Sequence, residues 1–125
     1  MKKICFLLLA SFALAVTVQA QGGPQRRTVE ERVAIIHAKL DSAFKLDASK
    51  AAEVDSVFAT YYRATDKIRE EMMASGERPD FQAMQEKTHP FVEARDEKLK
   101  KILPEAQYEK WKKEIEPSMR RPPRQ

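Results

Sequence analysis

Four residues of one long predicted helix have the chemistry of an adaptable binding surface. At about 100° per residue they fall within about 60° of one another on a helical wheel: Phe58, Tyr62, Arg69 and Met73. Aromatic rings, a guanidinium and a thioether suit loose contact with many apolar sequences. The same side chains could instead widen the buried face of the helix, because a small domain needs its large residues for packing. The sequence leaves both interpretations open.

Arg95 is the second residue of interest, because it lies within the apolar stripe of a later predicted helix. An unpaired charge is costly in a protein core, so either the stripe is open to water there or Arg95 is ion-paired. Glu53, Asp55 and Asp66 are candidate partners. The functional interpretation is an open, concave and partly basic face that includes Arg95.

Metal binding and catalysis have little support in the sequence. His37 and His89 are the only histidines, and they are neither spaced at i and i+4 nor set in an acidic cluster. The single cysteine, Cys5, precedes most of an apolar N-terminal run, and no serine, histidine and acid form an evident arrangement. We therefore expect no metal, no cofactor and no enzymatic activity.

The long helix that carries the four residues is predicted over 47–75, with Asp47 as its cap and Gly76 as its stop. Its apolar stripe is Val54, Val57, Phe58, Tyr61, Thr65, Ile68 and Met72. A long helix with one apolar side needs other helices to cover that side.

Three further helices are predicted to supply this cover. Thr28 and Glu31 form a capping box that opens a helix over 28–45, on which Ile35 lies off the apolar stripe. A third helix, with Asp80 as its expected cap, keeps one apolar phase from Phe81 to Ile102 through Pro90, which predicts a single helix kinked at 86–90. A short fourth helix carries Tyr108, Trp111 and Ile115 and is expected to end at Pro117. The fold class is all-α: a long helical hairpin with a short helix at each end.

The ends of the chain predict export. A basic start, an apolar run and Val18-Gln19-Ala20 are typical of a secretory signal peptide over 1–20. Its removal lowers the 23 basic side chains to 21, against 19 acidic ones, and leaves no cysteine. We expect a disordered leader over 21–27, one helical domain over 28–116 and a disordered, basic, proline-rich tail over 117–125.

Two similar segments carry a resemblance to a known family. Leu46-Asp47-Ala48-Ser49-Lys50 and Leu103-Pro104-Glu105-Ala106-Gln107 each have a leucine, a helix-starting residue and a long polar side chain. With the exported, cysteine-free helical frame, the chain resembles the LTxxQ group of periplasmic proteins, the Spy- and CpxP-like chaperones and stress adaptors. Asp47 and Pro104 stand where that family has threonine, and Lys50 stands where it has the first glutamine. The resemblance implies a cradle-like antiparallel homodimer whose concave face holds unfolded proteins.

The leading functional hypothesis is a periplasmic, ATP-independent holding chaperone or envelope-stress adaptor. Its expected partners are unfolded or partly folded proteins, bound through Phe58, Tyr62, Arg69, Met73 and Arg95. The alternatives are an interaction module whose helices serve a fixed partner or self-association, and a metal-responsive periplasmic sensor. We expect no nucleic-acid partner, because the mature charge is small, and weak contact with the envelope surface stays open.

Overall fold

The computed structural model describes residues 26–76 and 80–120, and every regular element in these ranges is helical. The elements in order are α1 (Val29–Phe44), α2 (Ala48–Ala74), α3 (Phe81–Ile102), α4 (Glu105–Lys110), the π-helix η1 (Trp111–Ile115) and α5 (Glu116–Met119). The predicted all-α class is confirmed. The predicted signal peptide, most of the leader, the turn at 77–79 and residues 121–125 of the tail lie outside the described residues.

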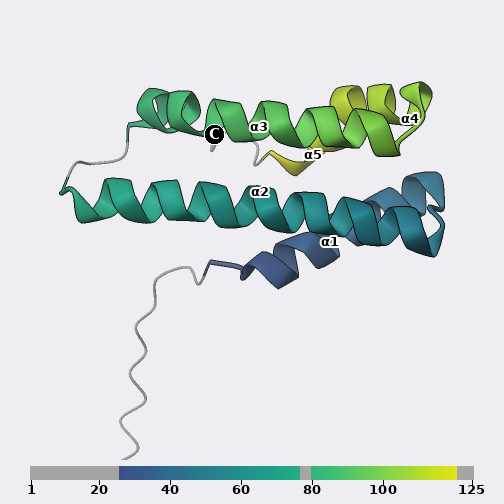
Figure 1. The fold of residues 1–125 in the computed structure, drawn as a ribbon, viewed down its shortest axis with the longest axis horizontal. Helices are drawn as coiled ribbons and strands as arrows, with labels where there is room; N and C mark the ends of the chain where they lie inside the picture. The colour runs from purple at the N-terminus through teal and green to yellow at the C-terminus, as the bar shows by residue number, and fades with distance from the viewer. Residues whose placement is uncertain (1–25, 77–79, 121–125) are drawn as a thin grey trace, which may run out of the picture.

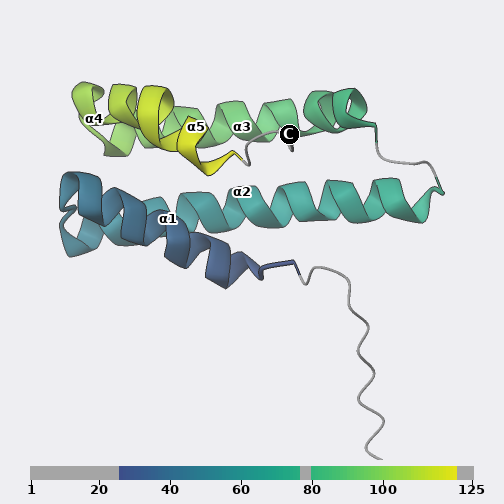
Figure 2. The same ribbon diagram turned by 180° about the vertical axis from the view of Figure 1, so that it is seen from behind.

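The long helices α2 and α3 run antiparallel, as the predicted hairpin requires (Figure 1). The shorter elements α1 and α4–η1–α5 both lie on one face of this hairpin, which the view from behind turns toward the reader (Figure 2). They cover the half of the hairpin that contains the start of α2 and the end of α3. The other half contains the end of α2 and the start of α3, which are the helices described there, and we call it the distal hairpin.

The hydrophobic core lies where these four helical segments meet. We call α4–η1–α5 the C-terminal run. The core residues come from α1, α2, α3 with its C-cap, and the C-terminal run: Ile36, Leu40, Val54, Val57, Phe58, Leu99, Leu103, Trp111 and Ile115. The stripe predicted for α2 is buried or half-buried throughout, whereas Ser56, Arg63 and Lys67 on its other side are exposed. Burial of this stripe is therefore what holds α2 against both neighbours.

The helix starts follow the predicted capping chemistry with one difference. The capping box of α1 is complete, because Thr28 Oγ1 accepts from the Glu31 amide at 3.2 Å and Glu31 Oε2 accepts from the Thr28 amide at 2.8 Å. Asp47 Oδ1 accepts from the Lys50 amide at 2.8 Å and caps α2. Asp80 occupies the cap position of α3, but its side chain makes no cap hydrogen bond. Gly76 ends α2 with a positive φ of 75°, a conformation that strains other residues.

Helix α3 passes through Pro90 without ending, as predicted from its unbroken apolar phase. Both views show its ribbon changing direction in its first half (Figures 1 and 2). Proline removes one helical hydrogen bond, and the Thr88 hydroxyl bonds back to the Met84 carbonyl at 2.7 Å in the same stretch. Both features favour a bend on the N-terminal side of the proline.

The predicted end of the last helix at Pro117 is wrong, because the helical run continues to Met119. Pro117 sits in the first turn of α5, where its missing amide hydrogen costs nothing. The preceding π-helix carries the chain into this turn without a break. Met119 packs against the core, so part of the predicted disordered tail belongs to the folded domain.

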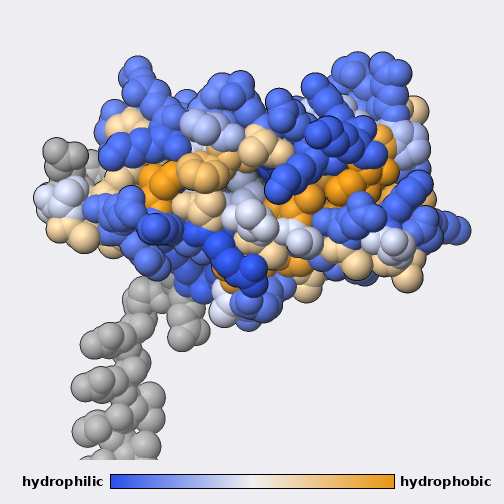
Figure 3. Space-filling view, in the orientation of Figure 1, coloured by the Kyte–Doolittle hydropathy of each residue, from blue (hydrophilic) through white to orange (hydrophobic). Residues whose placement is uncertain are grey.

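The apolar stripe predicted for α3 is buried only in its second half. Leu99 is fully buried, but Phe81 is 75% exposed and Phe91 is 39% exposed. Met73, near the end of α2, is 60% exposed. We call Met73, Phe81 and Phe91 the distal patch. In the space-filling view, apolar residues show along the seam between α2 and α3 and are bordered by hydrophilic ones (Figure 3).

Candidate functional site

An open cleft of about 1040 Å3 lies between α1, the middle of α2, α3 and the C-terminal run. Six arginines line it, Arg26, Arg27, Arg32, Arg69, Arg95 and Arg120, with three acidic residues, Asp66, Glu70 and Glu116. Between them lie apolar and aromatic side chains: Ile35, Ile36, Phe58, Tyr61, Tyr62, Val92, Trp111 and Met119. We call it the arginine cleft. It combines positive charge with apolar surface, which is the chemistry that the sequence predicted around Arg95.

Four of the five predicted binding residues line this cleft, but they differ in exposure. Phe58 is 1% exposed and belongs to the core, so the packing interpretation holds for that residue. Tyr62 and Arg69 are half-buried at the cleft. Arg95 is 6% exposed. Met73 lies apart from the cleft, in the distal patch.

Arg95 is paired, but with different carboxylates from those predicted. Its Nε and Nη2 donate to Asp96 Oδ1 at 2.9 and 2.7 Å, and Nη2 also donates to Glu116 Oε1 at 2.6 Å. Lys112 completes the group with contacts to Asp96 at 2.9 Å and Glu116 at 2.6 Å. We call these four residues the Arg95 cluster. The predicted partners are wrong because the C-terminal helices fold back beside α3 and bring Glu116 to Arg95.

Two of the three candidate carboxylates, Asp55 and Asp66, have partners elsewhere. Asp55 contacts His37 Nδ1 at 2.9 Å on the outer side of α1 and α2. Asp66 pairs with Arg32 and also lies 3.5 Å from Arg69. The guanidinium of Arg32 additionally lies over the ring of Tyr62, 4.5 Å from its centroid. These contacts fix the wall of the cleft that α1 and α2 share.

Three aromatic rings surround the Arg95 guanidinium. The centroids of Tyr61, Trp111 and Phe58 lie 4.7, 5.7 and 5.9 Å from it. Phe58 and Trp111 themselves meet edge to face, with centroids 5.2 Å apart. Cation–π attraction and two carboxylates together offset the loss of water around the buried charge. Arg95 therefore holds α2, α3 and the C-terminal run together at the floor of the cleft.

The pKa values of Glu116, Arg95 and Lys112 shift in the directions that keep these three groups charged. Burial favours the neutral form of Glu116, but hydrogen bonds from Lys112 and Arg95 outweigh it and lower the pKa of this carboxyl. Burial opposes the charge of Arg95 too, and the hydrogen bond and charge of Asp96, followed by those of Glu116, raise its pKa. The pKa of Lys112 rises for the same reason. At neutral pH the cluster is a closed set of two cations and two anions.

The sequence did not single out Trp111 as a site residue, although it placed Trp111 on an apolar stripe. Trp111 is 1% exposed, and its indole Nε1 donor is buried with no hydrogen-bond partner among the described residues. It begins the π-helix. This form is rare in proteins, but where it occurs it is often at a functional site. Neither the π-helix nor the missing acceptor leaves a pattern in the sequence.

The residues of the predicted family motif lie at the helix junctions. Leu103 is buried and Leu46 packs against the core from the partly buried shell. Pro104 precedes α4 without a side-chain cap, as its lack of a capping oxygen predicts. Lys50 is exposed, whereas Gln107 has a buried Oε1 with no partner among the described residues. Both segments thus lie at a junction between two helices, but their side chains have different surroundings.

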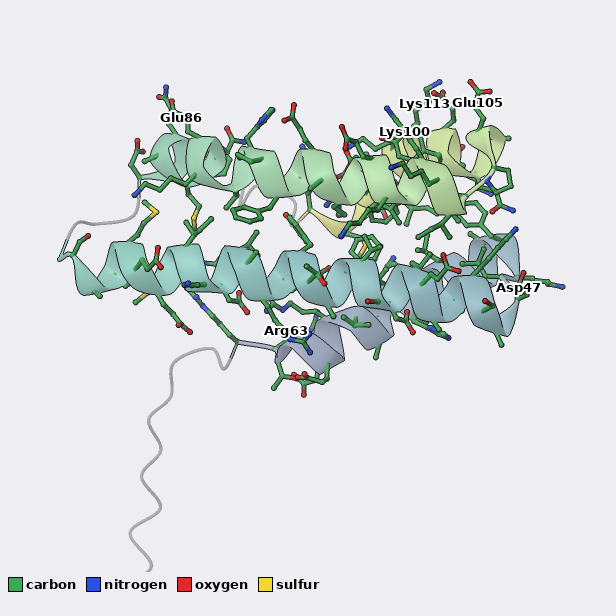
Figure 4. All side chains as sticks on the ribbon, viewed as in Figure 1. Asp47, Arg63, Glu86, Lys100, Glu105 and Lys113 are labelled. Carbon is green, nitrogen blue, oxygen red and sulfur yellow. The ribbon has the colours of Figure 1, made fainter. Side chains whose placement is uncertain are left out.

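The side chains at the outer edges of the hairpin are polar. Figure 4 shows Glu86 and Lys100 pointing away from α2, and Arg63 on the side of α2 away from α3. Within residues 26–76 and 80–120, no group of three or more histidine, cysteine, aspartate or glutamate side chains could hold a metal ion. No helix in the same ranges is long and apolar enough to cross a membrane.

Comparison of the chain with models of known protein families, with curated proteins and with solved structures finds no significant match. The resemblance to the LTxxQ group therefore stays a prediction that rests on the quoted segments.

Proposed function

We propose that this protein is an exported, ATP-independent holding chaperone, or an envelope-stress adaptor of the same kind, that binds partly unfolded polypeptides. One observation carries the proposal: Met73, Phe81 and Phe91 of the distal patch are exposed on a half of the hairpin that no third helix of the described residues covers. Only ten hydrophobic residues of the described chain are buried, so leaving three large ones exposed is a substantial loss of packing.

The composition of the patch favours varied partners over one fixed partner. A methionine and two phenylalanines on helices adapt to many apolar sequences, because thioethers and rings pack without directional bonds. The bend of α3 at Pro90 sets the first turns of that helix at their own angle. Of the predicted binding residues, Met73 belongs to the distal patch. Tyr62 and Arg69 line the arginine cleft and are half-buried there.

The proposed activity needs no chemical step. An unfolded segment binds because its apolar side chains and the patch leave water together. Once the client folds, it buries those side chains in its own core and the contact is lost. Folding of the client thus provides the release that ATP provides in other chaperones.

The test is light scattering of several unrelated proteins that aggregate on heating or dilution, with and without the mature chain and without nucleotide. We expect the parent to suppress aggregation and the Phe81→Ser, Phe91→Ser double variant to lose most of this effect. Glu97→Ser, Lys98→Ser is the matched control, since both side chains are exposed on α3 and neither has a hydrogen bond or ion pair with a described residue. Circular dichroism checks that all three chains are equally helical.

Two results would overturn the proposal. One is a parent chain that leaves the aggregation of every substrate unchanged. The other is a stable dimer that the patch variant converts to monomers while it still protects clients. Light scattering coupled to gel filtration measures the second result, which would make the patch an interface for self-association.

A further inference from the structure

The arginine cleft has more positive charge than its own acidic residues balance. Its lining has six arginines and three carboxylates. Arg95 and Arg32 have short ion pairs, and Arg69 shares Asp66 with Arg32. Arg26, Arg27 and Arg120 pair with no other described residue. The pKa of Arg69 is lowered, first by burial and then by the charge of Arg26, so neighbouring cations repel one another here.

Apolar side chains lie among these arginines without being covered. Ile35 lies off the packing stripe of α1, and it lines the cleft half-buried. Val92 on α3 and Met119 on α5 are also half-buried and line the same space. Three separate elements therefore contribute apolar surface to one concave site. A small inorganic anion would use the charge of this site and leave the apolar part in contact with water.

Trp111 adds a buried donor at the same place. The residue lines the cleft, is 1% exposed, and its Nε1–H has no acceptor among the described residues. An unmet buried donor is uncommon, because desolvating the group without a partner is unfavourable. Because Trp111 lines the cleft, its indole ring can report a ligand that enters there.

We propose that the arginine cleft binds a single-chain anionic amphiphile, a molecule with a carboxylate or phosphate head and an apolar chain. The rim arginines Arg26, Arg27 and Arg120 hold the head together with Arg69, since guanidinium groups bind carboxylates and phosphates through paired hydrogen bonds. Ile35, Val92 and Met119 cover the chain. The volume of about 1040 Å3 lies at the upper end of the range for small-molecule sites. This activity is separate from the proposed holding of polypeptides, which uses the distal patch.

The test uses the only tryptophan of the chain, Trp111, as its probe. The mature protein is titrated with dodecanoate and with dodecyl phosphate below their micellar concentrations, and Trp111 fluorescence and calorimetry are followed. We expect saturable binding of both compounds, weakened by salt. Dodecanol should bind at least about tenfold more weakly, because it lacks the charge. Inorganic phosphate and acetate should bind weakly too, because they lack the chain.

Variants locate the site. Arg27→Ala, Arg120→Ala changes only exposed residues at the rim and should weaken dodecanoate binding about tenfold or more while the helix content is kept. Arg69→Ala should also weaken it. Arg63→Ala is the matched control, since Arg63 is an exposed arginine of α2 that does not line the cleft. It should change the affinity less than about twofold.

Several outcomes would overturn the proposal. These are the absence of saturable binding, equal binding of dodecanol, or an equal loss for Arg63→Ala and the rim variant. Binding to phosphatidylglycerol–phosphatidylcholine vesicles without binding to free dodecanoate would assign the arginines to a bilayer surface. Binding of an acidic peptide without dodecanoate would assign the cleft to polypeptides. Aggregation assays do not enter this test, so the two proposals can fail separately.

Discussion

Single residues of the predicted binding surface have opposite surroundings, although they lie side by side on a helical wheel. Phe58 is enclosed by Trp111 and the Arg95 guanidinium, whereas Met73 is exposed at the other end of the same helix. A wheel gives the direction of a side chain around its helix, but not how far along the helix the neighbouring helices extend. Position along α2 decides which of the four residues are core.

The first prediction compares Phe58 and Met73. Phe58→Ala should lower the free energy of unfolding by about 3–5 kcal/mol, because it empties a fully buried site. Met73→Ala should change it by less than about 0.5 kcal/mol, because that side chain is exposed. Urea unfolding followed by circular dichroism measures both. Similar midpoints for the two variants would contradict the assignment of Phe58 to the core and Met73 to the surface.

The second prediction concerns Glu116 and acid. The pKa of Glu116 is lower in the folded chain than its ordinary value of 4.5, so its contribution to stability is complete above that value. This contribution is lost as the pH falls through the lower, folded pKa. Glu116→Gln should therefore destabilise the protein at neutral pH, and the gap from the parent should narrow in acid below about pH 4.

Thermal unfolding between about pH 2 and pH 7 checks this, with Glu97→Gln as the control for an exposed glutamate of α3. A gap between Glu116→Gln and the parent that stays constant down to about pH 2 would show that the carboxylate charge does not stabilise the fold.

At the scale of elements, the sequence predicts most of the helices because local chemistry sets their starts and stops. The capping box at Thr28 and the Asp47 cap form as their residue types require. The passage of α3 through Pro90 follows from its unbroken apolar phase. The end of the last helix at Pro117 was mispredicted. A proline is compatible with a first helical turn, and Pro117 lies in the first turn of α5.

The arginine cleft could be predicted only in part. The position of Arg95 within an apolar stripe predicts either a face open to water or a paired arginine, and Arg95 is paired and 6% exposed. Its partner Glu116 and the orphan donor of Trp111 depend on how the C-terminal run folds back over the hairpin. That return depends on contacts between residues far apart in the chain, which no local pattern reports.

The third prediction separates two caps of the same residue type. Asp47→Ala should lower the free energy of unfolding by about 1 kcal/mol, because the Lys50 amide loses its side-chain acceptor. Asp80→Ala should have a smaller effect, because Asp80 makes no side-chain cap hydrogen bond. Chemical unfolding of both variants gives the comparison. An equal loss of stability in the two would show that the Asp80 side chain caps α3 in solution.

The whole molecule is thick at one end and thin at the other. Four helical segments enclose the core near the start of α2, whereas the distal hairpin has two helices and one buried hydrophobic residue outside that core, Met72. Stability within a protein follows the local density of packing. The distal hairpin is therefore expected to open more readily than the core end.

The fourth prediction measures this difference by amide hydrogen exchange. Residues 82–90 of α3 should exchange faster than residues 95–102 of the same helix, because only the second stretch packs under the C-terminal run. Peptides from both stretches can be compared in one experiment, so each serves as the control for the other. Equal protection would mean that another chain covers the distal hairpin in solution.

The ion pair between Arg95 and Glu116 also constrains the order in which the chain can fold as it is synthesised. Until residue 116 has been synthesised, the charge of the Arg95 guanidinium is balanced only by Asp96, and its set of aromatic contacts is incomplete. Trp111 and Ile115 of the core are equally late, although Ile36 and Leu40 emerge early. The N-terminal helices therefore stay partly exposed until η1 and α5 have been synthesised. Proteolytic cleavage before Trp111 would return a finished molecule to that unfinished state.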